Sequence, residues 1–145
     1  MRVLLDTNVL VRATGNSHGP ARDVFLQVLT PPHVIVASNF LLDELRRVLA
    51  YPRVQRIHGL TAEERESFVR DVETVAELVD VPGSLFQVKH DPDDDPIVAL
   101  AIYGRAEVLC TLDRHLRRPE VASFCAQFNV RVLTDVELLS ALQVP

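Results

Sequence analysis

Short apolar runs that alternate with longer amphipathic segments limit the fold of this chain more than any other feature. Four such runs, at residues 3–5, 33–37, 107–111 and 130–133, are each too short for a helix and are rich in Val, Leu and Ile. Continuous apolar runs of this length are typical of strands that are buried on both faces. Residues 86–88 (Phe-Gln-Val) are a fifth candidate. The alternation predicts an α/β fold, a three-layer α/β/α sandwich around a mostly parallel sheet of about five strands.

Helix-start signals lie between these runs. Ser38 or Asn39 is placed to cap a helix that extends to about Tyr51, where Pro52 ends it. Thr61 and Glu64 form a capping box. This capping box starts a helix whose inner face is formed by Phe68, Val72, Val75, Ala76 and Val79. Three more helices are expected: one over residues 20–29, one that starts at Pro96, and one that starts at a second capping box, Thr134 to Glu137.

Length and composition exclude several classes of protein. The 145 residues fit one domain, 1–145, without repeats or a linker. No apolar run approaches the roughly 20 residues that span a bilayer, and the start of the chain lacks a secretory signal, so we expect a cytoplasmic protein with no membrane partner. The net charge of −5 argues against a protein that coats nucleic acid by charge alone. Cys110 and Cys125 lack metal-ligand spacing and are interpreted as buried free thiols.

Two aspartates lie just after predicted strands. Asp6 follows the first strand and Asp113 follows the run at 107–111. In a parallel sheet, ligands bind beyond the carboxyl ends of the strands, which is where both side chains are expected. Each residue also suits a turn or a helix cap, and the local sequence does not decide between the two roles.

Glu44 lies inside an amphipathic helical segment rather than at its start. Helical spacing puts it on the same stripe as Phe40, Leu41 and Val48, which predicts that it faces inward. A carboxylate on an apolar face has to be paired or to bind a metal, because burying it alone is costly. The alternative is an ion pair with Arg47 or with a basic residue from another element.

The acidic segment 91–95 (Asp-Pro-Asp-Asp-Asp) precedes the helix that starts at Pro96. Asp95 is placed to cap that helix, which leaves the other aspartates without a structural role. Four carboxylates within five residues repel one another and need solvent or a cation. Local chemistry does not choose among them.

Together, these carboxylates suit a hard divalent cation. Mg²⁺ and Mn²⁺ prefer carboxylate oxygens, and a bound ion activates water and orients a phosphodiester. The five histidines show no zinc-ligand spacing, and no phosphate-binding glycine loop occurs. A receiver domain would need a lysine after a late strand, but the only lysine is Lys89. A haloacid-type phosphatase would need an acid where Asn8 stands.

Four segments, in order, resemble the acidic motifs of the PIN-domain family. They are Asp6-Thr-Asn-Val-Leu10, Leu41-Leu-Asp-Glu-Leu45, the stretch from Asp91 to Ala101, and Val108 to Asp113. The resemblance extends over essentially the whole chain. It implies a metal-dependent ribonuclease whose catalytic and metal-binding residues are Asp6, Glu44, Asp94 and Asp113, with Mg²⁺ or Mn²⁺ as cofactor. Matching Ile97 and Ala101 to the helix pattern of the family favours Asp94 over Asp95 as the third ligand.

The resemblance also implies partners. Small members of the family are often toxins that are held by an antitoxin protein and that form homodimers, so RNA, an antitoxin and a second copy are the expected partners. Asn8 and Thr111 are expected to hydrogen-bond the metal ligands, and several arginines are candidates for phosphate contacts: Arg12, Arg46, Arg47, Arg53 and the 114–118 cluster. The alternative function is a non-catalytic PIN-like domain that binds RNA or protein.

Overall fold

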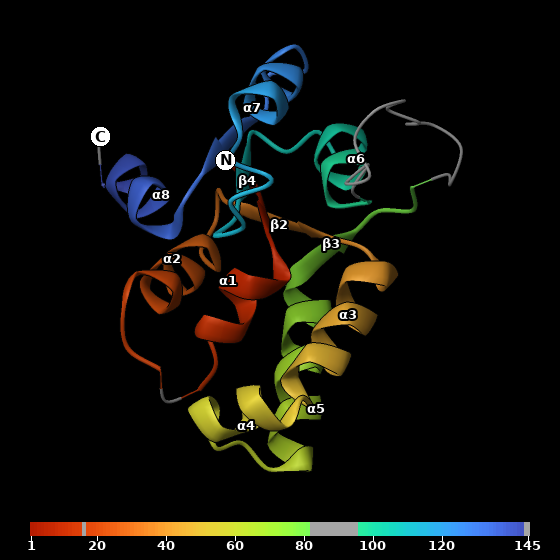
Figure 1. The fold of residues 1–145 in the computed structure, drawn as a ribbon, viewed down its shortest axis with the longest axis vertical. Coiled ribbons are helices and arrows are strands. Elements are labelled where there is room, and N and C mark those ends of the chain that lie inside the picture. Colours follow the sequence, from red (N-terminus) through yellow and green to blue (C-terminus); the bar gives the residue numbers. More distant parts are fainter. Residues whose placement is uncertain (16, 82–95, 144–145) are drawn as a thin grey trace.

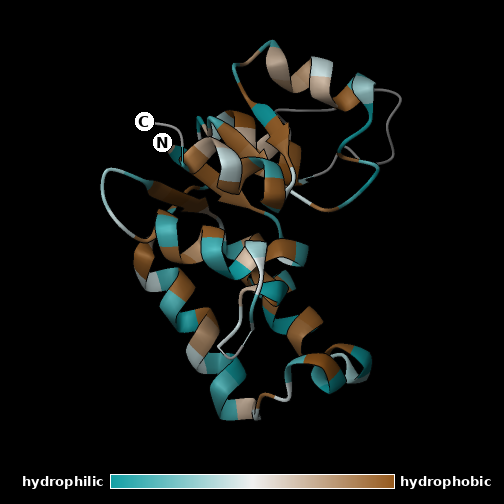
Figure 2. Ribbon diagram, turned by 90° about the vertical axis from the view of Figure 1, so that its left-hand side faces the viewer, coloured by the Kyte–Doolittle hydropathy of each residue, from teal (hydrophilic) through white to brown (hydrophobic). Residues whose placement is uncertain are grey.

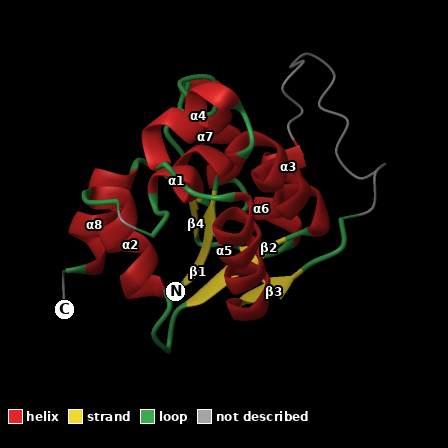
Figure 3. Ribbon diagram, turned by 90° about the horizontal axis from the view of Figure 1, so that it is seen from below, coloured by secondary structure: helices red, strands yellow, loops and turns green. Residues whose placement is uncertain are grey.

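A five-stranded parallel sheet forms the centre of the molecule. The computed structural model describes residues 1–15, 17–81 and 96–143. Its strands lie in the order β3-β2-β1-β4-β5, and every neighbouring pair is parallel. Figure 3 shows the strands in yellow with the helices around them. The strand bounds are β1 Arg2–Leu5, β2 Val34–Ala37, β3 Ala76–Leu78, β4 Val108–Cys110 and β5 Arg131–Leu133. The expected α/β class and parallel sheet are confirmed.

Helices cover both faces of this sheet. Figure 1 shows α6 and α7 on one side of the strands, with α1, α3 and α5 on the other. α8 packs against α2. The helix bounds are α1 Thr7–Arg12, α2 Pro20–Val28, α3 Asn39–Leu49, α4 Pro52–His58, α5 Ala62–Val75, α6 Pro96–Tyr103, α7 Pro119–Ala126 and α8 Asp135–Leu142. The three-layer arrangement follows from crossover connections that return each chain segment to a parallel strand.

The cap signals located most helix starts correctly. The Ser38 side chain accepts the Leu41 N–H, and both capping boxes, at Thr61 and Thr134, are complete. The prediction that the helix capped by Ser38 ends before Pro52 is confirmed, but the next helix, α4, was not predicted. Pro52 begins α4, because proline fits the first turn of a helix, where its missing N–H is not needed.

Residues 76–79 do not continue the helix as expected. α5 ends at Val75, which is exposed, and Ala76 begins β3. The segment pairs with the edge of β2, with Ala76 opposite Ile35, so a tertiary pairing overrides the helical period of the apolar residues. The candidate strand at 86–88 lies outside the described residues.

The core fills the space between the sheet and both helix layers. Figure 2 shows the central strands mostly brown and the helices with both brown and teal bands, as expected for buried strands and amphipathic helices. Gly104, after α6, packs so closely that a Cβ there would lie 2.7 Å from Val36 Cγ1 and 2.8 Å from the Leu100 carbonyl oxygen. Within the described ranges, no helix is both long and apolar enough to cross a bilayer.

The chain reverses its direction of winding between β1 and β4. From β1 it proceeds to β2 on one side, whereas from β4 it proceeds to β5 on the other. Such a reversal opens a crevice at the carboxyl ends of the two central strands, where open α/β sheets bind ligands. Asp6 and Asp113 follow these two strands, so the fold places both at the crevice.

Candidate active site

Asp6 is held at the end of β1 by three hydrogen bonds. Its Oδ1 accepts the Thr7 N–H at 2.8 Å, which makes Asp6 the N-cap of α1. Its Oδ2 accepts the Thr111 hydroxyl at 2.7 Å and the Asn8 side-chain amide at 3.2 Å. The cap role considered from the sequence is therefore real, but it uses only one of the two carboxylate oxygens. The other points across the sheet to β4.

Strand register explains the contact between Asp6 and Thr111. Leu5 pairs with Cys110, so the next residue on each strand, Asp6 and Thr111, lie opposite each other. The fully buried Thr111 hydroxyl also accepts the Asp113 N–H at 3.0 Å. One hydroxyl thus connects Asp6 to the backbone of Asp113, which fixes the two aspartates relative to each other.

Asn8 joins the same network from α1. Its amide also lies 3.5 Å from the Thr111 hydroxyl, and its Oδ1 accepts the Leu112 N–H at 3.1 Å. The expectation that Asn8 and Thr111 hydrogen-bond the candidate ligands is confirmed for Asp6. These hydrogen bonds connect β1, α1 and the segment after β4. We call the region around Asp6 and Asp113 the acidic corner.

Burial and neighbouring charge make the ionised form of Asp6 costly. Burial raises the pKa of Asp6, and the negative charge of Asp113 raises it further, whereas the hydrogen bonds from Thr111, Thr7 and Asn8 lower it. The net pKa is above the usual value. A cation placed beside Asp6 would reverse this effect, because it favours the charged form of the carboxyl group.

Glu44, on α3, lies near enough to Asp6 for their two charges to interact. Burial raises its pKa first and the charge of Asp6 second, while Arg47 and the Thr7 hydroxyl oppose the rise. Electrostatics therefore couple Glu44 both to Asp6 and to the alternative partner Arg47. The Thr7 hydroxyl is buried and, among the described residues, has no partner in hydrogen-bond geometry.

The inward stripe expected around Glu44 was partly wrong. Phe40 is 54% exposed, and the buried face of α3 is formed by Leu41, Leu42, Leu45 and Leu49. Glu44 lies at the boundary of that face, where it is only partly buried. A boundary position lets the carboxylate reach the crevice without being enclosed in the core.

The third expected ligand, Asp94, lies outside the described residues, as do Asp95 and the rest of the acidic segment. In the part of the chain that is described, no three His, Cys, Asp or Glu side chains are arranged to hold a metal ion. The donor chemistry nevertheless fits a hard divalent cation, since Asp6, Glu44 and Asp113 offer only carboxylate oxygens and at least two of them repel each other.

Asp135 is an acidic residue at the same sheet edge that the sequence analysis did not single out. It follows β5, is only 8% exposed, and lines a cavity together with Asn8. Burial raises the pKa of the Cys110 thiol to about 12, and the charges of Asp135 and Asp6 contribute. The signal in the sequence was an acid directly after a strand, the pattern that identified Asp6 and Asp113. The capping box that starts at Thr134 obscured it.

The candidate phosphate-binding arginines fall into two groups. Arg46 is bound within the surface, where it forms ion pairs with Asp43 at 3.0 Å, Glu66 at 3.2 Å and Glu73 at 3.8 Å. Arg12 and Arg53, in contrast, line a cavity of about 680 Å³ that also includes Asn8. The expectation for Arg46 therefore lacks support, because its guanidinium already has three carboxylate partners.

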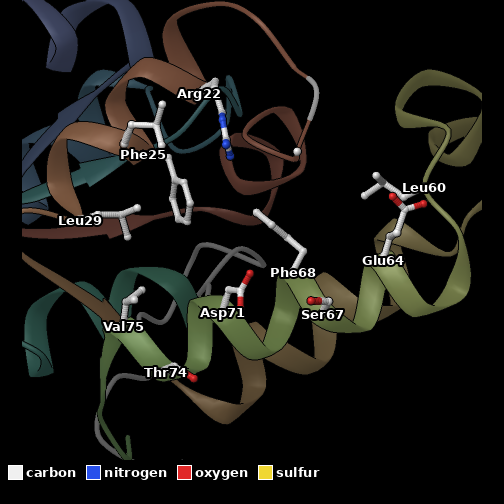
Figure 4. Close-up of a pocket in the computed structure, with 12 residues that line it drawn as sticks. Arg22, Phe25, Leu29, Leu60, Glu64, Ser67, Phe68, Asp71, Thr74 and Val75 are labelled. Carbon is white, nitrogen blue, oxygen red and sulfur yellow. The ribbon is translucent and has the colours of Figure 1, made fainter.

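A second cavity, of about 510 Å³, lies between α2 and α5 and contains none of the expected site residues. Figure 4 shows Phe25 of α2, and Leu29 just after that helix, facing Phe68 and Val75 of α5. The Phe25 and Phe68 ring centroids are 5.7 Å apart. This groove is mostly apolar, and its lining residues belong to other elements than Asp6, Asn8, Thr111 and Asp113.

Comparisons with known proteins agree with this geometry. The family model described as "PIN domain" matches residues 2–115. Among solved structures, the chain is similar to one from VapBC2 of Rickettsia felis bound to a DNA fragment from their promoter, with a TM-score of 0.59 and 18% sequence identity, covering 92% of this chain and 98% of that chain. No curated protein matches. At this identity the structural likeness establishes the fold alone.

Proposed function

The chain belongs to the PIN-domain family, and on that premise we propose that it is a metal-dependent endoribonuclease. The observation that carries the proposal is that Asp6, held in place by Thr111 and Asn8, interacts electrostatically with two other carboxylates, Asp113 and Glu44. Burial is the main cause that raises the pKa of both Asp6 and Glu44, and the charge of Asp113 adds to the rise at Asp6, as the charge of Asp6 does at Glu44. Carboxylates whose pKa values are raised by burial and by one another are typical of sites that bind a cation or carry out catalysis.

In this proposal Asp6, Glu44, Asp94 and Asp113 hold Mg²⁺ or Mn²⁺. The bound ion supplies an activated water and neutralises charge that develops on the phosphodiester. The surrounding residues position these ligands. Thr111 orients Asp6 and the Asp113 backbone through one hydroxyl, and Asn8 braces both strand ends. Ligands that are held by outer hydrogen bonds in this way bind metal more tightly than free ones.

The activity is tested with purified protein and a labelled single-stranded RNA. Cleavage is expected with Mg²⁺ or Mn²⁺ and should stop with EDTA. Equal cleavage with and without the chelator would refute the metal-dependent mechanism. If no RNA of any kind is cleaved although Mn²⁺ binds, the alternative of a non-catalytic RNA- or protein-binding domain is favoured.

The ligand assignment is tested with two neighbouring aspartates as a matched pair. Asp94→Asn replaces a charged ligand by a weaker neutral one, so Mn²⁺ affinity and single-turnover cleavage should fall together, the rate by roughly 100-fold. Asp95→Asn should be nearly harmless, because asparagine caps a helix about as well as aspartate. An inactive Asp95→Asn beside an active Asp94→Asn would move the assignment by one residue.

We also propose an antitoxin protein as a partner and a homodimer as the oligomeric state. Support comes from the fold shared with a chain of the VapBC2 complex and from exposed apolar side chains, Leu26, Leu29 and Val75, along the groove between α2 and α5. Apolar grooves of this kind accept amphipathic segments of other proteins. Co-purification with the product of a short reading frame just upstream tests the antitoxin. Light scattering that gives a strict monomer at micromolar concentration would refute the homodimer.

A further inference from the structure

The cavity of about 680 Å³ adjoins the acidic corner through a shared residue. It lies between α1, the start of α2 and α4, whose positions can be followed in Figure 1. Asn8 lines the cavity and also donates to Asp6. A molecule in the cavity would therefore extend directly to the candidate catalytic carboxylates. The volume falls in the range of roughly 300–1,000 Å³ that is usual for small-ligand sites, which is enough for one nucleotide.

Two cations from separate helices line this cavity. Arg12 comes from the last turn of α1 and Arg53 from the first turn of α4, and both are exposed. Neither forms an ion pair or a side-chain hydrogen bond with any residue that the structure describes, in contrast to Arg46 and to Arg22, which donates to the Ala13 carbonyl at 2.7 Å. Among the residues that the structure describes, none therefore competes with a ligand for these two guanidinium groups.

Because the chain has a net negative charge, a polyanionic substrate needs local positive charge in order to bind. The net charge is −5, and the acidic corner repels phosphate. Local positive charge beside the corner offsets that repulsion, and arginine suits phosphate because its planar group binds two oxygens at once. Asp135, at the buried part of the wall, opposes phosphate there and favours a donor such as a base amino group or a ribose hydroxyl.

The rest of the wall is mainly apolar, with Ser17, His18 and His58 as its other polar side chains. Val11, Val48, Val54 and Ile57 line it, and Ile57 is 82% exposed although it is a large apolar side chain. His58 is fixed: its Nδ1 accepts the Leu60 N–H at 2.9 Å, so its Nε2 carries the proton and donates to the Leu49 carbonyl at 3.0 Å. Apolar side chains next to two arginines fit a nucleotide, whose base presents an apolar face and whose phosphate is anionic.

We propose that this cavity binds a nucleotide of the RNA strand beside the cleaved bond, with Arg12 and Arg53 on its phosphates and the apolar wall against its base. The assignment rests on the proposed ribonuclease function, since it names a substrate subsite of the same enzyme. It selects two of the candidate arginines and assigns no substrate contact to Arg46.

The test measures RNA binding separately from cleavage. Wild-type protein in EDTA is titrated into a fluorescein-labelled single-stranded RNA of about ten nucleotides, and anisotropy gives Kd at several salt concentrations. The variants are Arg12→Gln and Arg53→Gln. Arg56→Gln is the matched control, because Arg56 lies on α4 and is exposed but does not line the cavity. A gel confirms that the RNA stays intact.

Each cavity variant should weaken binding by about 3- to 10-fold and lower the slope of log K against log salt by about 0.7, the value for one phosphate contact on a single strand. Arg56→Gln should stay within about 2-fold of wild type, since it removes no phosphate contact. Arg12→Lys and Arg53→Lys, which keep the charge, should restore most of the salt slope, and this separates a phosphate contact from a folding defect.

Three outcomes are decisive. If all three glutamine variants bind RNA alike, the subsite is refuted, even if cleavage is normal. If a peptide of ten glutamates depends on Arg12 and Arg53 while RNA does not, the cavity is a protein-binding site and the proposal fails. If binding depends on both arginines but no RNA is cleaved under any condition, the subsite stands and the proposed catalytic function fails.

Discussion

The Thr111 hydroxyl is the most informative single group to remove. Thr111→Val keeps the shape of the side chain and deletes the hydroxyl that donates to Asp6 at 2.7 Å and accepts the Asp113 N–H at 3.0 Å. The Thr111 side chain is fully buried, so water does not readily take the place of its hydroxyl. An ionised acceptor left with one hydrogen bond fewer, together with an unpaired N–H, should cost roughly 2–4 kcal/mol of unfolding free energy at pH 7.

The loss should depend on pH in a defined direction. The folded-state pKa of Asp6 is raised above its ordinary value of 3.8. The contribution of Asp6 to stability is therefore fully present below that ordinary value and is lost as pH rises through the folded-state pKa. Without the Thr111 hydrogen bond, which lowers that pKa, the ionised form becomes still less favourable. The variant should therefore lose more stability at pH 7 than at pH 4.

Urea unfolding of metal-free protein at pH 4 and pH 7 measures both effects. The control is Thr74→Val, whose exposed hydroxyl donates only to the Arg70 carbonyl of its own helix and should change stability by less than about 0.5 kcal/mol. A loss in Thr111→Val below about 0.5 kcal/mol, or one equal at both pH values, would refute the reasoning. It would mean that the hydroxyl does not stabilise the Asp6 carboxylate.

Three further predictions follow from packing and charge. Gly104→Ala should destabilise the protein by about 1–3 kcal/mol, because the added Cβ overlaps neighbouring atoms. Gly15→Ala is the control, since the nearest atom to its Cβ is 3.9 Å away, and equal melting temperatures for the two variants would contradict the prediction. Glu44→Gln should leave metal-free protein at pH 7 as stable as wild type or more so, because it removes a repelled carboxylate, yet weaken Mn²⁺ binding in calorimetry; unchanged affinity would exclude Glu44 as a ligand. Burial raises the pKa of Cys110 to about 12 and that of Cys125 to about 11. Both thiols should therefore resist iodoacetamide at pH 8 until urea unfolds the chain, and rapid labelling of the native protein would contradict this.

Local chemistry was enough to predict the features that depend on a few neighbouring residues. The helix starts at Ser38, Thr61 and Thr134 are set by side chains that bond backbone groups three residues away. The buried strands are set by continuous apolar runs. The expectation that acids follow the two central strands needed only the α/β alternation, because parallel strands all end at one edge of the sheet.

Features that depend on the partner of a segment were not predictable from its own residues. Ala76–Leu78 is a strand because it pairs with β2, although its apolar spacing also fits a helix. α1 and α4 are short, and Pro52 begins α4 rather than only ending the segment before it. Short segments carry too few residues for their periodicity to decide, so packing against the rest of the fold decides instead.

The sequence by itself determined the fold class, the caps and which carboxylates stand at strand ends, because each of these follows from backbone geometry and from residues close together in the chain. Only the tertiary structure decided that Asp6 and Thr111, 105 residues apart, share a hydrogen bond, because the register of β1 on β4 sets them opposite each other. It also decided that Arg46 is bound by three carboxylates while Arg53 lines the cavity beside the acidic corner. An arginine in the sequence has the same charge in either place, and only the positions of the surrounding anions determine what it can bind.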